Sequence, residues 1–241
     1  MSLEPSPWTA SLAVLFIWMV LVFGGLILQF GHGTSLEHIV SKVSYPLMAA
    51  SLFLLLLVAY RGWWQEVGLE PRSASNLAAS VVPGLAIIAV WILACRRGLT
   101  LDTTWKLTGA NTLLVGFSEE LMFRGILFYG AQSSFGSKWA VVITAAIFGL
   151  VHYLNGAITG KWKQAAEQAI INVFAGFWLA ALRVELNSII PLIAIHWLWD
   201  FGLFSAGSRK TVYIKSASFD AILPLACELI LFIYGLWLLY A

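Results

Sequence analysis

The chain has 241 residues, of which 60% are hydrophobic and only 11% are charged, and its formal net charge is +2. A soluble globular domain carries about 25% charged residues, so this composition excludes a water-soluble protein. The basic residues are spread among short segments and form no basic patch, and we therefore expect no nucleic-acid partner. The sequence instead predicts a protein whose surroundings are the lipid bilayer.

Apolar runs near 20 residues long recur along the chain, which is the length that a helix needs to cross a hydrocarbon core of roughly 30 Å. We predict an all-α polytopic membrane helix bundle with about eight transmembrane helices. No long linker interrupts the runs, so residues 1–241 are expected to form a single integral membrane domain. The predicted spans are Trp8–Phe30, Val43–Tyr60, Leu77–Cys95, Asn111–Ala131, Lys138–Leu154, Gln164–Leu182, Ser188–Ala206 and Ala221–Tyr240.

Basic residues in alternate connections predict the orientation of the bundle, because cytoplasmic loops carry an excess of Lys and Arg. One set of connections holds four such residues, namely Arg61, Arg72, Lys138 and Arg183. The other set holds nine, namely Lys42, Arg96, Arg97, Lys106, Lys161, Lys163, Arg209, Lys210 and Lys215. We therefore expect the second set to face the cytoplasm, which places both termini on the outer side.

Ionisable residues stand out inside the apolar spans, because each charge at a helix centre opposes insertion by roughly 2.5–3.5 kcal/mol. Polar contacts between membrane helices contribute only about 0.6 kcal/mol on average, so packing alone explains such a set poorly. A functional site is the better interpretation. The residues in question are Glu119, Glu120, Arg124, His152, His196 and Asp200.

The spacing of the charges in the fourth span separates their roles. Glu120 and Arg124 are four residues apart and share a helix face, which favours a structural ion pair that neutralises both charges. Glu119 lies about 100° around the helix from Glu120 and is left without that partner. We therefore predict that Glu119 is a general base that faces a cavity.

The alternation of the spans places Glu119, His152, His196 and Asp200 in the same half of the bilayer, on the side of the more basic connections. This shared depth predicts one hydrolytic site built from these residues. The chain contains no H-E-x-x-H zinc helix, no G-x-S-x-G nucleophile elbow and no Gly-Asp pair of the intramembrane aspartyl proteases. A serine or paired-aspartate mechanism is therefore unsupported.

Three motifs occur in order on apolar segments, with E-E-x-x-x-R at 119–124, F-x-x-x-H at 148–152 and H-x-x-x-D at 196–200. In this combination the chain resembles the CAAX protease and bacteriocin-processing (CPBP, or Abi) family, which includes the type II CAAX prenyl endopeptidases. The resemblance covers a catalytic core of about 111–206. The stretch 63–69 is also similar to the family's upstream loop.

The resemblance implies an eight-helix bundle with a cavity open toward the cytosol. In it, Glu119 and His152 would activate a water molecule, and His196 and Asp200 would stabilise the oxyanion. The prenyl endopeptidases carry Asn where this chain has Asp200. Asp200 is therefore either protonated, or it orients His196, or it belongs to a metal site of two histidines and one or two carboxylates, which zinc accepts. The favoured interpretation requires no metal ion, although the family is commonly described as metalloproteases.

The leading functional prediction is an intramembrane endopeptidase that cuts a peptide or protein substrate near the membrane surface. The substrate would be a prenylated C-terminus or, in a bacterium, a leader peptide, a bacteriocin or a membrane-protein segment. One alternative is a non-catalytic peptide-binding or immunity membrane protein. Another is a cation-coupled transporter, since intramembrane carboxylates and histidines also build ion pathways. The absence of an inverted repeat with paired broken helices disfavours the transporter.

Overall fold

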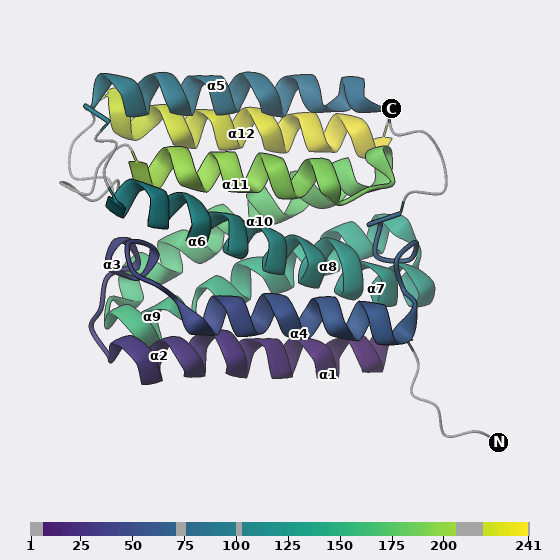
Figure 1. The fold of residues 1–241 in the computed structure, drawn as a ribbon. Coiled ribbons are helices and arrows are strands. Elements are labelled where there is room, and N and C mark those ends of the chain that lie inside the picture. The colour runs from purple at the N-terminus through teal and green to yellow at the C-terminus, as the bar shows by residue number, and fades with distance from the viewer. Residues whose placement is uncertain (1–6, 71–75, 100–102, 206–218, 241) are drawn as a thin grey trace.

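The computed structural model describes residues 7–70, 76–99, 103–205 and 219–240. Within these ranges every regular element is a helix, and the long helices run side by side along one common direction (Figure 1). The prediction of an all-α bundle is therefore confirmed. Two short helices, α3 (Leu36–Val40) and α9 (Asn155–Thr159), lie at one end of the bundle.

The eight predicted spans each correspond to a helix or to a continuous run of helical segments. The runs are α1 (Pro7–Met19), η1 (Val20–Gly24) and α2 (Gly25–Phe30); α4 (Tyr45–Arg61); η2 (Leu77–Ser80) and α5 (Val81–Arg96); α6 (Thr103–Glu120), η3 (Leu121–Leu127) and α7 (Phe128–Phe135); α8 (Ser137–His152); α10 (Trp162–Leu186); α11 (Ile190–Ser205); and α12 (Phe219–Tyr240). Of these segments η1 and η3 are π-helical and η2 is a 3₁₀ turn.

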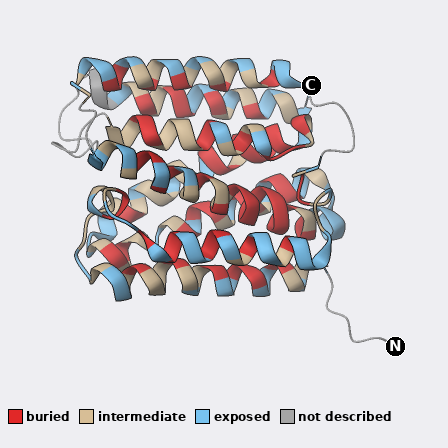
Figure 2. Ribbon diagram, in the orientation of Figure 1, coloured by how far each residue is buried: buried red, intermediate tan, exposed pale blue. Residues whose placement is uncertain are grey.

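Five helical runs in the described ranges are long and apolar enough to cross a membrane, and α4 and α11 are shorter apolar helices. Large apolar side chains cover the outer faces, among them Leu28, Leu56, Ile88 and Ile230. Figure 2 shows the buried residues gathered in the middle of the bundle, where α8, α10 and η3 pack, with exposed positions along the outer helices. The outer surface is apolar because its solvent is lipid, and the chain is an integral multi-pass membrane protein.

The fourth predicted span differs most from its expected form. It was predicted as 111–131, whereas α6, η3 and α7 form one continuous helical run from Thr103 to Phe135. Its middle segment η3 is a π-helix that begins directly after Glu120, and every residue of η3 is buried. A π-helical turn inserts residues into the regular ladder and is frequent at functional sites. Hydropathy reads only the apolar centre of such a helix, so the prediction missed both polar ends.

Close packing between α8 and α10 depends on two glycines. A Cβ atom at Gly176 would lie 2.9 Å from the Cα of Ala145, and one at Gly149 would lie 2.6 Å from the carbonyl oxygen of Ala169. Small residues let membrane helices approach this closely. Such packing matters in lipid, because apolar side chains there give no hydrophobic drive for helices to associate. The contact fixes the end of α8, and His152 is the last residue of that helix.

The basic residues used to predict the orientation fall into three groups. Arg72, Arg209, Lys210 and Lys215 lie outside the described residues. Most of the others lie at helix ends, as expected. Arg183 lies in the last turn of α10 but is only 5% exposed. The helix therefore extends beyond its predicted end at Leu182, and the Arg183 side chain packs inside the protein.

Candidate active site

Four of the predicted site residues come together at the end of the bundle that carries α3 and α9. Glu119 comes from α6, His152 from the end of α8, and His196 and Asp200 from α11. The Oε2 atom of Glu119 lies 3.8 Å from Nε2 of His152 and 3.9 Å from Nε2 of His196. The same His196 nitrogen is 3.5 Å from Oδ2 of Asp200. One carboxylate oxygen is thus shared between two imidazoles.

The backbone of α8 sets the tautomer of His152. Its Nδ1 atom lies 2.8 Å from the carbonyl oxygen of Phe148, one helical turn earlier. A carbonyl only accepts hydrogen bonds, so Nδ1 donates its hydrogen, and in the neutral ring Nε2 carries the lone pair. The Phe148 ring also packs against the imidazole, with the ring centroids 4.5 Å apart. The basic nitrogen of His152 is therefore held toward Glu119.

Glu120 orients the second histidine. Its Oε1 atom lies 2.7 Å from Nδ1 of His196, which donates because a carboxylate oxygen accepts. The same oxygen accepts a hydrogen bond of 2.9 Å from Nη1 of Arg124. Sequence spacing indicated only the Arg124 pair, because His196 lies 76 positions away on another helix. Glu120 therefore does more than neutralise Arg124: it joins α6 to the histidine of α11.

Arg124 and Phe148 connect this network to the next helix. The guanidinium carbon of Arg124 lies 4.1 Å from the centroid of the Phe148 ring, and the Arg124 side chain is 1% exposed. A desolvated cation over an aromatic face gains about 2 kcal/mol. Phe148 thus contacts Arg124 with its ring and His152 with its carbonyl group. These two contacts explain why the second motif has a phenylalanine at position 148.

A second arginine, Arg183, holds the 63–69 loop, which follows α4. The guanidinium of Arg183 donates to the carbonyl oxygens of Arg124, at 3.2 Å, and of Glu66, at 3.3 Å. Gly68 in this loop has φ +79°, and a Cβ there would lie 2.8 Å from the Arg183 guanidinium. The loop therefore needs glycine at position 68 for two reasons, its left-handed backbone and the close arginine. Through Arg183, the 63–69 stretch is tied to the backbone of η3.

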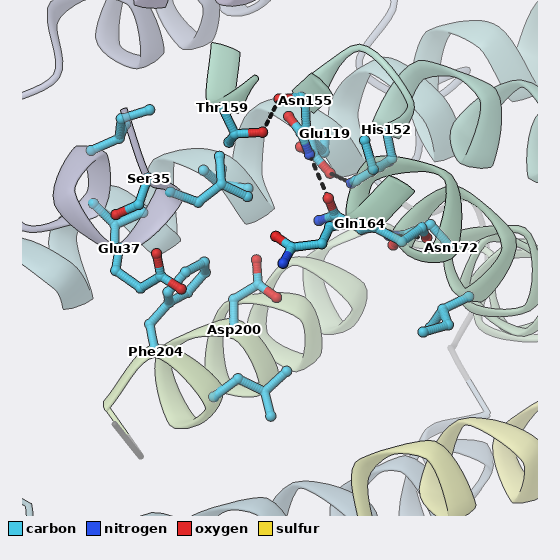
Figure 3. Close-up of a pocket in the computed structure, with 18 of the residues that line it drawn as sticks. Ser35, Glu37, Glu119, His152, Asn155, Thr159, Gln164, Asn172, Asp200 and Phe204 are labelled. Atoms are coloured by element: carbon cyan, nitrogen blue, oxygen red, sulfur yellow. Dashed lines mark hydrogen bonds and ion pairs between the residues drawn. The ribbon is translucent and has the colours of Figure 1, made fainter. Parts of the chain in front are cut away.

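The site residues line a cavity of about 360 Å³. Figure 3 shows Glu119 and His152 next to each other on one side of this cavity, with Asp200 facing them from α11. Apolar side chains from η1, α2 and α3 form another wall, including Phe23, Leu26 and Ile39. Glu119 Oε2 is buried and has no hydrogen-bond partner. Such an atom in a cavity marks the place where a water or substrate group binds.

Sequence reasoning missed several polar groups that line the cavity. Asn155, Gln164, Gln168 and Asn172 contribute amides, and Asn155 Nδ2 donates to Gln168 Oε1 at 2.9 Å. The last three recur every four residues on α10, a spacing that could have signalled a polar helix face. Glu228 of α12 also lines the cavity and was overlooked inside the predicted span 221–240. Its carboxylate in an apolar run was a signal available in the sequence.

Zinc binding can be tested against the side chains present. Two imidazoles with one or two carboxylates form a donor set that zinc accepts at about 2.0–2.2 Å per ligand. In the described ranges, no group of three or more His, Cys, Asp or Glu side chains is arranged to hold a metal ion. Nδ1 of His196 donates to Glu120 and Nδ1 of His152 donates to Phe148, which leaves the Nε2 atom of each histidine facing Glu119. As they stand, the side chains of the described residues do not form a closed metal centre.

The fold and the site define a class: a multi-pass membrane protein with a glutamate and histidine site inside its helices. Residues 100–202 match the family model described as type II CAAX prenyl endopeptidase Rce1-like, over less than half of the chain. This match confirms the resemblance to the CPBP family and supports, in general terms, a CAAX-type intramembrane protease. None of the curated proteins and none of the solved structures that were compared matches the chain.

The buried ion pair gives a first testable prediction. Arg124→Ala should lower the free energy of unfolding by about 3–5 kcal/mol, because it leaves the buried Glu120 carboxylate without its cation. Thermal unfolding of the detergent-solubilised protein measures the effect. Arg61→Ala is the matched control, since Arg61 is exposed and should change stability little. An Arg124→Ala protein as heat-stable as the unchanged protein would show that the pair contributes nothing.

Proposed function

We propose that this protein is an endopeptidase that hydrolyses a peptide bond near the membrane surface with a water molecule activated by Glu119 and His152. The observation that carries the proposal is the buried Oε2 atom of Glu119, which lacks a hydrogen-bond partner and lies 3.8 Å from Nε2 of His152 in a cavity. A water molecule beside this gap is within hydrogen-bonding distance of both atoms. The whole chain is proposed to act as one membrane domain, with the catalytic core at about 111–206.

The first step forms the tetrahedral intermediate. Glu119 removes a proton from the water, and the oxygen attacks the carbonyl carbon of the scissile bond. His152 holds the attacking oxygen through its Nε2 atom, because its Nδ1 hydrogen already goes to Phe148. The electron pair of the carbonyl π bond moves to the carbonyl oxygen, which becomes the oxyanion. Charge on this oxygen must then be met by a donor.

His196 is the proposed donor to the oxyanion. Nδ1 of His196 donates to Glu120, so Nε2 can donate only when the ring carries both protons. Glu120 at 2.7 Å and Asp200 at 3.5 Å are negative neighbours that favour this doubly protonated ring. Asp200 therefore acts by orienting and charging His196, and does not itself meet the oxyanion. This interpretation explains how a carboxylate can replace the amide of the prenyl endopeptidases.

The second step breaks the peptide bond. The proton held by Glu119 passes to the nitrogen of the leaving amine, and the electron pair of the oxyanion re-forms the carbonyl group. The products are a carboxylic acid and an amine, and Glu119 returns to its starting carboxylate. The catalytic residues proposed for this cycle are Glu119, His152, His196 and Asp200, with Asp200 acting through His196.

The cavity is proposed to open toward the cytoplasm. This orientation is supported by the bias of basic residues, of which Arg96, Arg97, Lys161 and Lys163 belong to the side that carries α3 and α9. Lys161 itself lines the cavity. A peptide substrate would then reach the site from the cytoplasmic surface of the membrane.

Removal of either catalytic group should abolish hydrolysis. Glu119→Ala and His152→Ala are each expected to lower kcat/KM for peptide cleavage by at least ~10²–10⁴-fold, because the water is no longer activated. Cleavage is followed by mass spectrometry with the purified protein in detergent. Glu70→Ala and His38→Ala serve as controls, since both side chains are exposed. Full activity in the Glu119 or His152 variant, with both variants folded, would contradict the mechanism.

The role of Asp200 is decided by one amide substitution. Asp200→Asn should lower the activity without abolishing it, and chelators should have little effect, because Glu120 still orients and charges His196 and no metal ligand is lost. Activity is measured before and after dialysis against a chelator, with the metal content of the same samples. Stoichiometric zinc in the active protein together with an inert Asp200→Asn variant would establish a metal-dependent mechanism instead.

Orientation is tested by labelling in intact cells. In a Cys95→Ser background, a cysteine placed at Arg97 should resist a membrane-impermeant thiol reagent until the cells are lysed, because this connection is expected in the cytoplasm. A cysteine at Glu70, at the end of the opposite connection, should react without lysis. The reverse pattern would place the opening of the site on the outer face.

A further inference from the structure

Glu228 is a buried carboxylate that the proposed reaction does not use. It lies in α12, outside the segment that matches the family model, and is only 8% exposed. Its Oε2 atom accepts a hydrogen bond of 3.0 Å from the indole nitrogen of Trp178 in α10. Its other oxygen has no hydrogen-bond or ion-pair partner among the described residues.

Glu228 lines the active-site cavity. Pro224, Leu225 and Glu228 occupy one face of α12, and all three line the same cavity as Glu119 and Asp200. The bond from Trp178 fixes the carboxylate but adds no positive charge, because an indole is neutral. An unbalanced carboxylate inside an apolar helix opposes insertion by roughly 2.5–3.5 kcal/mol. Its geometry suits a cation that arrives through the cavity.

The charge of the whole cavity points the same way. Its described lining includes five carboxylates but only one ammonium group, that of Lys161. The carboxylates are those of Glu37, Glu119, Glu167, Asp200 and Glu228. The lining also includes His152 and His196, so the carboxylates outnumber the groups that can carry positive charge. A recess lined mainly by one sign of charge focuses the field and concentrates ligands of the opposite sign. The cavity should therefore attract a substrate cation.

We propose that the cavity selects peptide segments that carry a lysine or arginine side chain, whose cation pairs with Glu228 while the scissile carbonyl lies at Glu119 and His152. Glu228 is then a specificity-determining residue on the last helix. The inference rests on the proposed endopeptidase function and narrows its substrate class.

A purely structural role for Glu228 can be separated from this one. In that case the carboxylate would serve only to hold α12 against α10 through Trp178. Glu228→Gln keeps an oxygen that can accept from Trp178 and removes the charge. The substitution should therefore preserve the fold while abolishing the preference for a cation. Glu70→Gln is the control, because it removes an exposed carboxylate from the connection between α4 and η2, outside the cavity lining.

Two measurements test the inference on the full-length protein in lipid nanodiscs. The first digests a randomised peptide library with blocked termini and compares the residues around each cut for the unchanged protein, Glu228→Gln and Glu70→Gln. The second measures binding of the blocked peptides acetyl-LLALKALL-amide and acetyl-LLALQALL-amide to the Glu119→Ala protein, with and without Glu228→Gln. The binding measurement does not depend on catalysis.

We expect lysine and arginine to be enriched near the cuts by at least ~10-fold, and Glu228→Gln to remove this enrichment while Glu70→Gln keeps it. Cleavage without such enrichment, or enrichment that survives in Glu228→Gln, would overturn the inference and leave the endopeptidase function standing. If no peptide is cut, the proposed function fails. The inference then stands only if the lysine peptide binds at least ~10-fold more tightly than the glutamine peptide and Glu228→Gln removes the difference.

Discussion

The candidate site depends on one carboxylate oxygen, Oε1 of Glu120. It accepts hydrogen bonds from Arg124 at 2.9 Å and from His196 at 2.7 Å, and the Glu120 side chain is fully buried. A buried carboxylate costs less when a cation balances its charge and it accepts hydrogen bonds, and here both bonds go to this one oxygen. Arg124 supplies the charge, and the remaining bond positions His196. The same interaction that makes Glu120 stable in a membrane therefore sets the geometry of the site.

The two adjacent glutamates have different roles because they lie on different faces of α6. Glu120 points into the packed helices, whereas Glu119 is 15% exposed and lines the cavity. The π-helical segment η3 starts immediately after them and buries its whole length, including Arg124. Phe148 links Arg124 to His152, since its ring packs against the Arg124 guanidinium and its carbonyl group accepts a hydrogen bond from His152. Three sequence motifs thus form one connected network of side chains.

Polar groups in this protein are concentrated on the cavity side of the helices that form it. The same space is lined by amides of α10, by acidic groups of α6, α11 and α12, and by Lys161, and apolar side chains of η1 and α2 form another wall. A peptide bond in such a cavity meets hydrogen-bonding groups on one side and an apolar surface on the other. This arrangement suits a peptide substrate at the membrane surface that has both polar and apolar side chains.

The sequence alone determined the class of the fold and most of the site. Hydropathy located the apolar helices, because burial in lipid requires long charge-free runs, and spacing of four residues predicted the contact of Glu120 with Arg124. Motif order brought Glu119, His152, His196 and Asp200 into one expected site. Tertiary structure alone decided that Glu120 also binds His196, that Arg183 is buried against the 63–69 loop, and that Glu228 reaches the cavity. These contacts join helices far apart in the chain, and periodicity within one helix carries no information about which residue of another helix it will face.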